Sequence, residues 1–298
     1  MFAAPPDLPT EIFARLPDAL RIVEGPTPWS EARGGPPLHS FLQGPSFDRD
    51  GRLYCVDVNH GRIFRITEPD RWEVFADYEG HPNGLKIHRD GRIFVADHSR
   101  GLLCFDPDTG RGEEVETDFR GLNDLVFADD GNLYFTDPGE SGLEDPHGRV
   151  FRLDADGTLD LLLDRLPYPN GLVLDPAQNA LYVAVSRSLQ ILRAPLHDGR
   201  VRKCGVFLQL SGGLGGPDGM AVCDDGSLVV AHAGFGSAWW FSALGDPLGR
   251  IRSCAGIRTT NVAFHPQRRN ELYMTEAEHG VILRTRLPST GRLMYSHR

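Results

Sequence analysis

A short motif recurs six times along the chain, at intervals of 40 to 48 residues. In each copy a polar residue opens a short apolar strand pattern, a tight turn follows, and a second apolar strand returns. The opening residues are Gln43, Asn83, Asn123, Asn170, Asp218 and Asn261. Turn signals such as Asp50-Gly51 and Asp130-Gly131 separate the paired strands. A repeat of this length, built of β-hairpins, is typical of a β-propeller in which each repeat forms one blade.

We therefore predict an all-β fold, a six-bladed β-propeller with four antiparallel strands per blade and a metal site at one mouth of its central channel. Residues 41–298 should form a single domain, because one small blade cannot bury both of its faces without neighbours. Residues 1–40 form a lead-in that can close the ring. Within it, the apolar patch Leu20–Val23 is our candidate for the closing strand, whereas Thr10–Leu16 reads as a helical or irregular segment.

Composition narrows the function classes and the compartment. The chain of 298 residues carries a net charge of −10, so nucleic acid and anionic membrane surfaces are poor partners for it. No stretch is apolar and long enough to cross a bilayer, and the amino terminus does not resemble a secretory signal. The 5 cysteines include no Cys-x-x-Cys pair, which favours a reducing cytoplasm. We expect a small-molecule substrate and a monomer or small homo-oligomer.

The innermost strands of a propeller surround its central channel. The six opening residues should therefore converge at one channel mouth. The residues 14 positions further on return to the same face and add acids and a histidine around it; they are Asp57, Asp97, Asp137, Ala184, His232 and Thr275. The loop 137–149 is the longest on this face and is a candidate wall for a substrate.

Amide and carboxylate oxygens at one point suit a hard divalent cation, most naturally Ca²⁺, with Mg²⁺, Mn²⁺ or Zn²⁺ as alternatives. A single Asn-Gly or Asp-Gly pair is more often a turn than a ligand. Here, however, a separate Asp-Gly turn follows most of these strands, and the polar residues recur at matching places in every repeat. We therefore interpret the ring of six opening residues as a metal-binding cluster.

Four segments follow one another along the chain: Phe41-Leu-Gln-Gly-Pro-Ser-Phe-Asp, Gly121-Leu-Asn-Asp-Leu, Pro169-Asn-Gly-Leu and Gly216-Pro-Asp-Gly-Met. Together, and in this order, they resemble the regucalcin/gluconolactonase family of six-bladed, metal-dependent lactonases. The resemblance implies that Asn123, Asn170 and Asp218 hold the metal. The family's glutamate ligand is replaced here by Gln43, which keeps a carbonyl oxygen but removes one negative charge. Glu24-Gly-Pro is similar to that motif but lacks the strands that should follow.

The resemblance implies a reaction in which the cation polarises a lactone carbonyl and a deprotonated water attacks it. As in proposals for the family, Asp218 can serve as the base, and Asp124 and His232 are further candidates. The alternative for Asp124 is a structural partner of the neighbouring turn, and for His232 a hydrogen-bonded core histidine. Asn83, Asn261 and His81 are candidates for substrate contacts.

Three classes of function remain open from the sequence. The first is a metal-dependent hydrolase of lactones or related cyclic esters. The second is an enzyme of the same scaffold with another metal-assisted reaction, such as isomerisation or condensation, for which Gln43 is the reason. The third is a non-catalytic propeller that binds a metal or a ligand.

Overall fold

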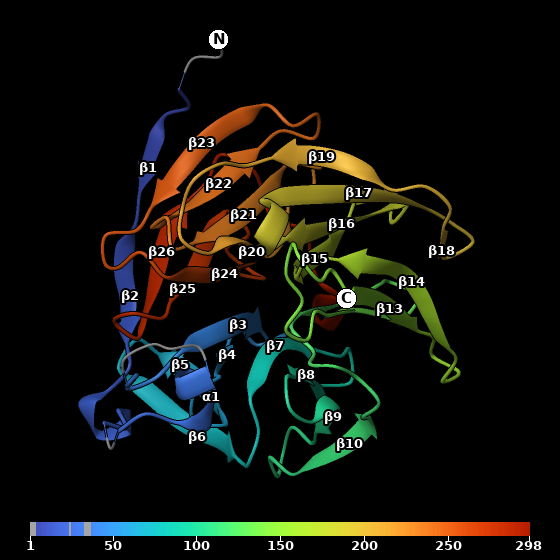
Figure 1. Cartoon of the computed structure of the whole chain (residues 1–298). Helices are drawn as coiled ribbons and strands as arrows, with labels where there is room; N and C mark the ends of the chain where they lie inside the picture. The colour runs from blue at the N-terminus through green and yellow to red at the C-terminus, as the bar shows by residue number, and fades with distance from the viewer. Residues whose placement is uncertain (1–3, 24, 33–36) are drawn as a thin grey trace.

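Six β-sheets stand around a central axis in the computed structural model, which describes residues 4–23, 25–32 and 37–298 (Figure 1). Blade 1 contains β3 (Leu42–Phe47), β4 (Leu53–Asp57), β5 (Arg62–Glu68) and β6 (Arg71–Asp77). Blade 2 contains β7 (Pro82–Ile87), β8 (Ile93–Asp97), β9 (Gly101–Phe105) and β10 (Gly112–Glu116). Blade 3 contains β11 (Leu125–Phe127), β12 (Leu133–Asp137), β13 (Gly148–Leu153) and β14 (Leu159–Leu166). The predicted six-bladed propeller is confirmed.

The second half of the ring repeats this plan with additions at its outer edge. Blade 4 contains β15 (Pro169–Leu174), β16 (Ala180–Val185), β17 (Gln190–His197) and β19 (Gly205–Gln209), with β18 (Arg200–Val201) paired to the end of β17. Blade 5 contains β20 (Gly216–Val222), β21 (Leu228–Ala233), β22 (Ser237–Phe241) and β23 (Pro247–Arg252). Blade 6 contains β24 (Thr259–Phe264), β25 (Glu271–Glu276) and β26 (Val281–Arg286). Its fourth strand comes from the other end of the chain.

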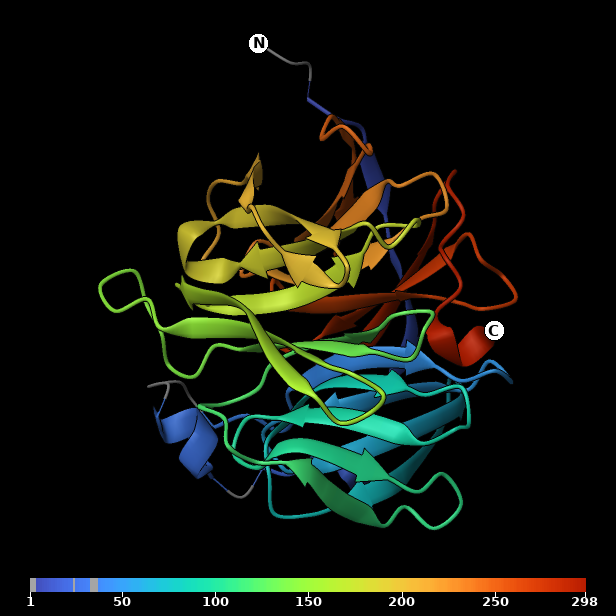
Figure 2. The same ribbon diagram turned by 90° about the vertical axis from the view of Figure 1, so that its right-hand side faces the viewer.

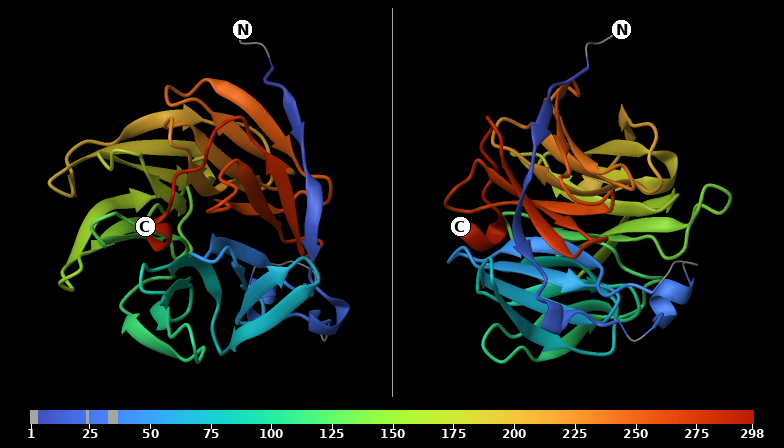
Figure 3. Two further views of the ribbon diagram at one scale, coloured as in Figure 1. Left: turned by 180° about the vertical axis from the view of Figure 1, so that it is seen from behind. Right: turned by 90° about the vertical axis from the view of Figure 1, so that its left-hand side faces the viewer.

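The ring is closed by β2 (Glu11–Arg15), which pairs antiparallel with β26 as the outer strand of blade 6. Just before it, β1 (Asp7–Pro9) adds a parallel strand to β23 of blade 5, so the amino-terminal segment runs along two blades (Figure 3). Our expectation that Leu20–Val23 supplies the closing strand is wrong, as is the helical or irregular interpretation of Thr10–Leu16. In β2, Ala14 packs into the core while Glu11 pairs with Arg284 at the surface, which is the alternation of a half-buried strand.

Apolar side chains pack between neighbouring blades, since each blade buries its faces only against the next one. The cluster of Tyr54, Val56, Leu85 and Val95, for example, joins blades 1 and 2. The strands β3, β4, β8, β15 and β16 are buried along their whole length. A rigid frame therefore holds the residues at the channel mouth.

The two ends of the channel are covered by different segments. The short helix α1 (Pro28–Ala32) and the carboxyl-terminal turn η3 (Tyr295–His297) lie on opposite faces of the ring (Figure 2). His297 contacts the carbonyl oxygen of Phe47 through Nε2, at 2.9 Å, and lines a small cavity between the inner strands. The carboxyl-terminal segment thus closes the end of the channel opposite α1. Among the described residues, no helix has both the length and the apolarity needed to span a membrane.

Candidate active site

A cavity of about 290 Å³ opens at the channel mouth on the α1 side. Five of the six predicted ring residues line it, and each comes from a different blade: Gln43, Asn83, Asn123, Asn170 and Asp218. Residues up to 175 positions apart in the sequence are therefore brought to one wall. The structure thus gathers the predicted residues, while their roles as ligands stay predictions.

Local irregularities in the inner strands direct these side chains toward the mouth. The pairing of the first two strands shifts register next to the ring residue in five blades, for example between Gln43 and Ser46 in blade 1 and between Pro217 and Met220 in blade 5. Such bulges bend a strand and redirect a side chain, and they occur often beside functional sites. Gly44 adopts a φ of +56° at this point, and a Cβ there would lie 2.5 Å from the carbonyl oxygen of Asn83.

The ring contains amide oxygens that no protein donor satisfies. Oδ1 of Asn83, Asn123 and Asn170 is buried in each case and has no hydrogen-bond partner. Leaving a buried acceptor unpaired costs about 1–3 kcal/mol. Three such groups around one cavity therefore indicate that the pocket is built for a ligand that accepts electron pairs from oxygen, as a hard cation does.

Asp218 is the one carboxylate among the cavity-lining residues that the structure describes. Burial raises its pKa to about 8, and the negative charge of Asp124 acts in the same direction. Hydrogen bonds from Gln43, the backbone of Gly219 and Asn170 act in the opposite direction. A carboxyl group of this kind changes its protonation near neutral pH and would ionise fully beside a cation.

Gln43 is turned toward Asp218 through its amide nitrogen rather than its oxygen. Nε2 donates to Oδ1 of Asp218 at 3.1 Å, while Oε1 accepts from the backbone N–H of Gly44 at 3.0 Å. Its carbonyl oxygen is therefore already engaged, unlike those of Asn123 and Asn170. Its place as a metal ligand stays a prediction, and Glu24 lies outside the described residues.

Asn261 does not belong to the ring, and the expectation that it does is wrong by one residue. In blades 1, 3 and 5 the ring residue lies four positions before the residue that pairs with the start of the second strand, as Gln43 does before Phe47. In blade 6 the equivalent residue is Phe264, which pairs with Leu272 near the start of β25, so Thr260 occupies the ring position. Thr260 donates its hydroxyl to the carbonyl oxygen of Leu42 at 2.8 Å.

Asn261 and Asp124 instead form the next layer down the channel, where the other blades have glycine. Nδ2 of Asn261 donates to Oδ2 of Asp124 at 3.3 Å, and Lys86 lies 3.7 Å from the other carboxylate oxygen. A Cβ on Gly219 would lie 2.0 Å from the Asn261 side-chain oxygen, so glycine there makes room for it. Neither Asp124 nor Asn261 lines the cavity, and we do not retain them for substrate contact or proton transfer.

The two histidine candidates lie outside the cavity lining as well. His232 is fully buried, with Nε2 3.0 Å from the carbonyl oxygen of Gly212 and Nδ1 accepting from Trp239 at 3.1 Å. Burial lowers the pKa of His232, so its imidazole is neutral. Both nitrogens are thus engaged in packing the fifth blade. Nδ1 of His81 is buried without a partner, but its role in substrate binding stays a prediction.

The acids at the ends of the second strands hold turns in place. Oδ1 of Asp57 accepts from the backbone of Phe41 and Asn59, and Oδ1 of Asp137 accepts from the backbone of Arg120 and Gly121. Their other oxygens pair with arginines, as in the Arg62–Asp57 bridge. These carboxylates are structural and do not extend the ring.

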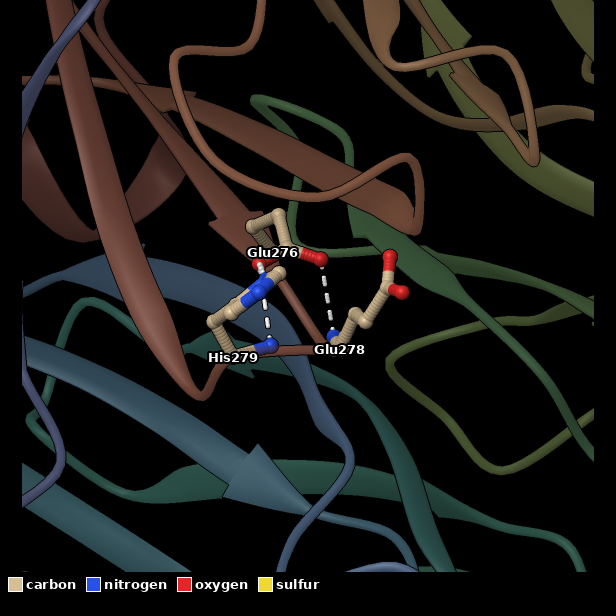
Figure 4. A group of neighbouring side chains, drawn as sticks. All are labelled: Glu276, Glu278 and His279. Atoms are coloured by element: carbon tan, nitrogen blue, oxygen red, sulfur yellow. Dashed lines mark hydrogen bonds and ion pairs between the residues drawn. The ribbon is translucent and has the colours of Figure 1, made fainter. Parts of the chain in front are cut away.

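Glu276 in blade 6 has the same structural role, although Glu278 and His279 beside it form a group with metal-ligand spacing (Figure 4). Its two oxygens accept from the backbone N–H groups of Glu278 and His279 at 2.8 and 3.0 Å. Glu278 in turn accepts from the backbone of Ile257. The group is therefore satisfied by protein donors.

Sequence reasoning missed the outer wall of the cavity. Trp29 of α1 and Phe41 pack together with ring centroids 4.9 Å apart and line the cavity, with Leu38 beside them and Tyr168 from blade 4. The expected wall, loop 137–149, acts only indirectly, because Oγ of Ser141 accepts from the backbone of Tyr168. No periodic signal marks α1, and only the folded chain brings it to the mouth.

Two arginines complete the rim. Arg187 lies in η2 (Ser186–Ser188) at the end of β16, and Arg258 lies just before β24. The Arg187 guanidinium sits over the Tyr168 ring, 5.0 Å from its centroid.

Comparison with known proteins finds relatives in sequence and in fold. Residues 41–278 match the family model described as SMP-30/gluconolactonase/LRE-like region. The lactonase drp35 of Staphylococcus aureus is 30% identical over 231 residues, which are 70% of this chain and 69% of that protein.

Two solved structures share the fold at lower sequence identity. A gluconolactonase from Xanthomonas campestris superimposes with a TM-score of 0.74 and 22% identity, covering 96% of this chain and 99% of that one. A calcium-binding regucalcin from Agrobacterium tumefaciens superimposes with a TM-score of 0.80 and 20% identity, covering 99% and 100%. This chain is a member of the SMP-30/gluconolactonase/LRE-like family.

Proposed function

We propose that this protein is a metal-dependent hydrolase that opens a lactone or related cyclic ester in the cavity at the channel mouth. The observation that carries the proposal is the set of buried, unpartnered amide oxygens beside a buried carboxyl group with a raised pKa. The relative named a lactonase and the structural neighbour named a gluconolactonase support the same class of reaction.

Asn123, Asn170 and Asp218 are the residues that would hold the cation. The unpartnered amide oxygens of Asn123 and Asn170 are hard donors, and Asp218 supplies the negative charge. Ca²⁺ suits such a set most naturally, with Mg²⁺, Mn²⁺ or Zn²⁺ as alternatives; the regucalcin neighbour is itself named as calcium-binding. A cation held there supplies Lewis-acid polarisation of the lactone carbonyl.

The residues of the chain account for the remaining steps. Asp218 in its ionised form accepts a proton from the attacking water, and the water oxygen forms a bond to the carbonyl carbon. When the ring C–O bond breaks, the same carboxyl group returns the proton to the leaving alkoxide, so the product is a hydroxy acid. The apolar wall of Trp29, Phe41 and Leu38 limits the access of other water to the reacting ester.

A second candidate, a non-hydrolytic metal-assisted reaction, is favoured by one observation. Gln43 directs an N–H rather than a carboxylate at Asp218, so the cluster holds one negative charge fewer than the resemblance implies. A less strongly charged cluster leaves a bound cation more electrophilic, which suits isomerisation or condensation as well as hydrolysis.

The test is metal analysis of the purified protein, followed by pH-stat measurement of acid release from aldonolactones and aromatic lactones, with and without EDTA. We expect acid release that EDTA abolishes and added Ca²⁺ or Mn²⁺ restores. Acid release that EDTA does not affect would contradict the metal requirement. Bound metal without hydrolysis of any lactone would favour the second candidate.

A further inference from the structure

The rim of the cavity carries two cations without acidic partners. Among the residues that the structure describes, no carboxylate forms an ion pair with Arg187 or Arg258. Glu278, close to Arg258 in the fold, accepts instead from the backbone of Ile257. The net charge of the chain is −10, and many of its other arginines do pair with acids, among them Arg62, Arg149, Arg250 and Arg292.

The segment between the two arginines is kept free of bulky side chains. Gly215, Gly216 and Ala233 of blade 5 line the cavity there. Gly216 has a φ of +121°, and a Cβ on it would lie 2.4 Å from the carbonyl oxygen of Ser186. A larger residue would therefore distort the turn that carries Arg187. The rim between the arginines stays open to a ligand group.

The lining of the cavity thus combines two kinds of chemistry. Trp29, Phe41 and Leu38 contribute an apolar surface, and the guanidinium groups of Arg187 and Arg258 contribute donors for an anion. Stacking on Tyr168 holds the Arg187 guanidinium in place, which reduces the entropy lost when it binds a ligand. A neutral polyhydroxylated lactone would use neither of these fully.

We propose that the substrate is a lactone that carries a carboxylate, with Arg187 and Arg258 holding this group while the ester lies at the ring of Asn123, Asn170 and Asp218. This inference rests on the proposed function of the same cavity and adds the chemical class of the substrate. The cavity, at about 290 Å³, suits a small compound of this kind.

The test compares two probes that differ only in charge: 5-oxotetrahydrofuran-2-carboxylate and the corresponding 2-carboxamide. We expect the native protein to prefer the carboxylate in kcat/KM by about 10- to 100-fold, the usual worth of one or two charge-assisted hydrogen bonds. Arg258→Gln and Arg187→Gln should each reduce this preference at least about 5-fold, and Arg258→Lys should restore part of it. Because screening weakens exposed charge pairs, the preference should also fall between low and high salt.

Arg202→Gln is the matched control, since it removes the same charge from an exposed arginine outside the cavity lining. It should leave kcat/KM for both probes unchanged. Calorimetric binding of the two lactam analogues, which resist hydrolysis, gives a readout that is independent of turnover. If neither lactone is hydrolysed but the lactam carboxylate binds through the arginines, the proposed lactone hydrolysis fails, while the assignment of Arg187 and Arg258 as carboxylate-binding residues stands. The inference is overturned if the carboxylate and the carboxamide have equal kcat/KM values, if the two lactams bind equally, or if both glutamine variants keep the native preference.

Discussion

Two groups of side chains at the same end of the propeller blades offer oxygen atoms, yet they differ in what surrounds those oxygens. At the mouth, the oxygens of Asn123 and Asn170 are buried without donors beside Asp218. At the end of β25, Glu276 is equally buried, but both of its oxygens accept backbone N–H groups. The number of acids therefore does not identify a cation site; acceptors that the protein leaves unpaired do.

The sharpest test of this comparison is Asp218→Asn. The change keeps the shape of the side chain but removes the negative charge and the proton acceptor from the cavity, so we expect lactone hydrolysis to fall by about 10³-fold or more. Cation binding should fall with it, as measured by calorimetry. Circular dichroism should show that the fold is retained. A variant that hydrolyses lactones at near-native rates would exclude Asp218 from the reaction.

Gln43→Glu tests whether the missing charge limits the mouth cluster. A carboxylate in place of the amide that now lies 3.1 Å from Asp218 adds charge to the cluster, so we expect cation affinity to rise by about 10- to 100-fold. Without a cation, the two carboxyl groups repel each other and the melting temperature should drop. A sharp rise in lactone hydrolysis would indicate that Gln43 weakens a lactonase site. Reduced turnover despite tighter cation binding would instead favour a different reaction.

The raised pKa of Asp218 predicts a pH dependence. Its carboxyl group has an ordinary pKa of 3.8 and one of about 8 in the folded protein. A group with a raised folded pKa stabilises the fold fully below its unfolded pKa. That contribution is lost as pH rises through the folded value. The metal-free protein should therefore lose stability between about pH 4 and pH 8, by up to about 1.4 kcal/mol per pH unit from this group.

Cation binding should show the opposite trend, since a cation requires the ionised carboxylate. Below about pH 8 we expect affinity to rise up to about tenfold per pH unit, with release of a proton on binding. Calorimetry in buffers of different ionisation enthalpy measures that proton. The Asp218→Asn variant is the control and should show a flat profile. A native affinity that does not change with pH would contradict the raised pKa.

Glu276→Gln should have the smallest effect, and only on stability. The amide oxygen can accept one of the two backbone N–H groups but loses the charge that strengthens both bonds, so we expect a loss of about 1–2 kcal/mol in the free energy of unfolding. Urea unfolding measures it. Metal content and lactone hydrolysis should match those of the native protein. Loss of bound metal in this variant would indicate that the cation binds at Glu276 rather than at the mouth, and it would contradict the comparison.

The sequence by itself determined the number of blades and the identity of most of the mouth residues. Hairpin turns and alternating apolar positions are local signals, and their repetition leaves a ring of small sheets as the arrangement that buries every face. Once the innermost strands face one axis, Gln43, Asn123, Asn170 and Asp218 must meet near it. In the sixth blade this prediction was wrong by one residue. Asn261 is the more polar residue in the sequence, but the strand register puts Thr260 at the ring position.

Only the tertiary structure decided which polar groups are free and what encloses them. The sequence analysis placed Asp57 and Asp137 around the channel mouth, and only their backbone donors, from segments whose positions no local pattern records, show that they are structural. The position of the closing strand β2 depends on its pairing with blade 6, and that of the wall residue Trp29 depends on its contact with Phe41. Hydrogen-bond satisfaction and long-range packing are properties of the assembled ring, so they become visible only when the chain is folded.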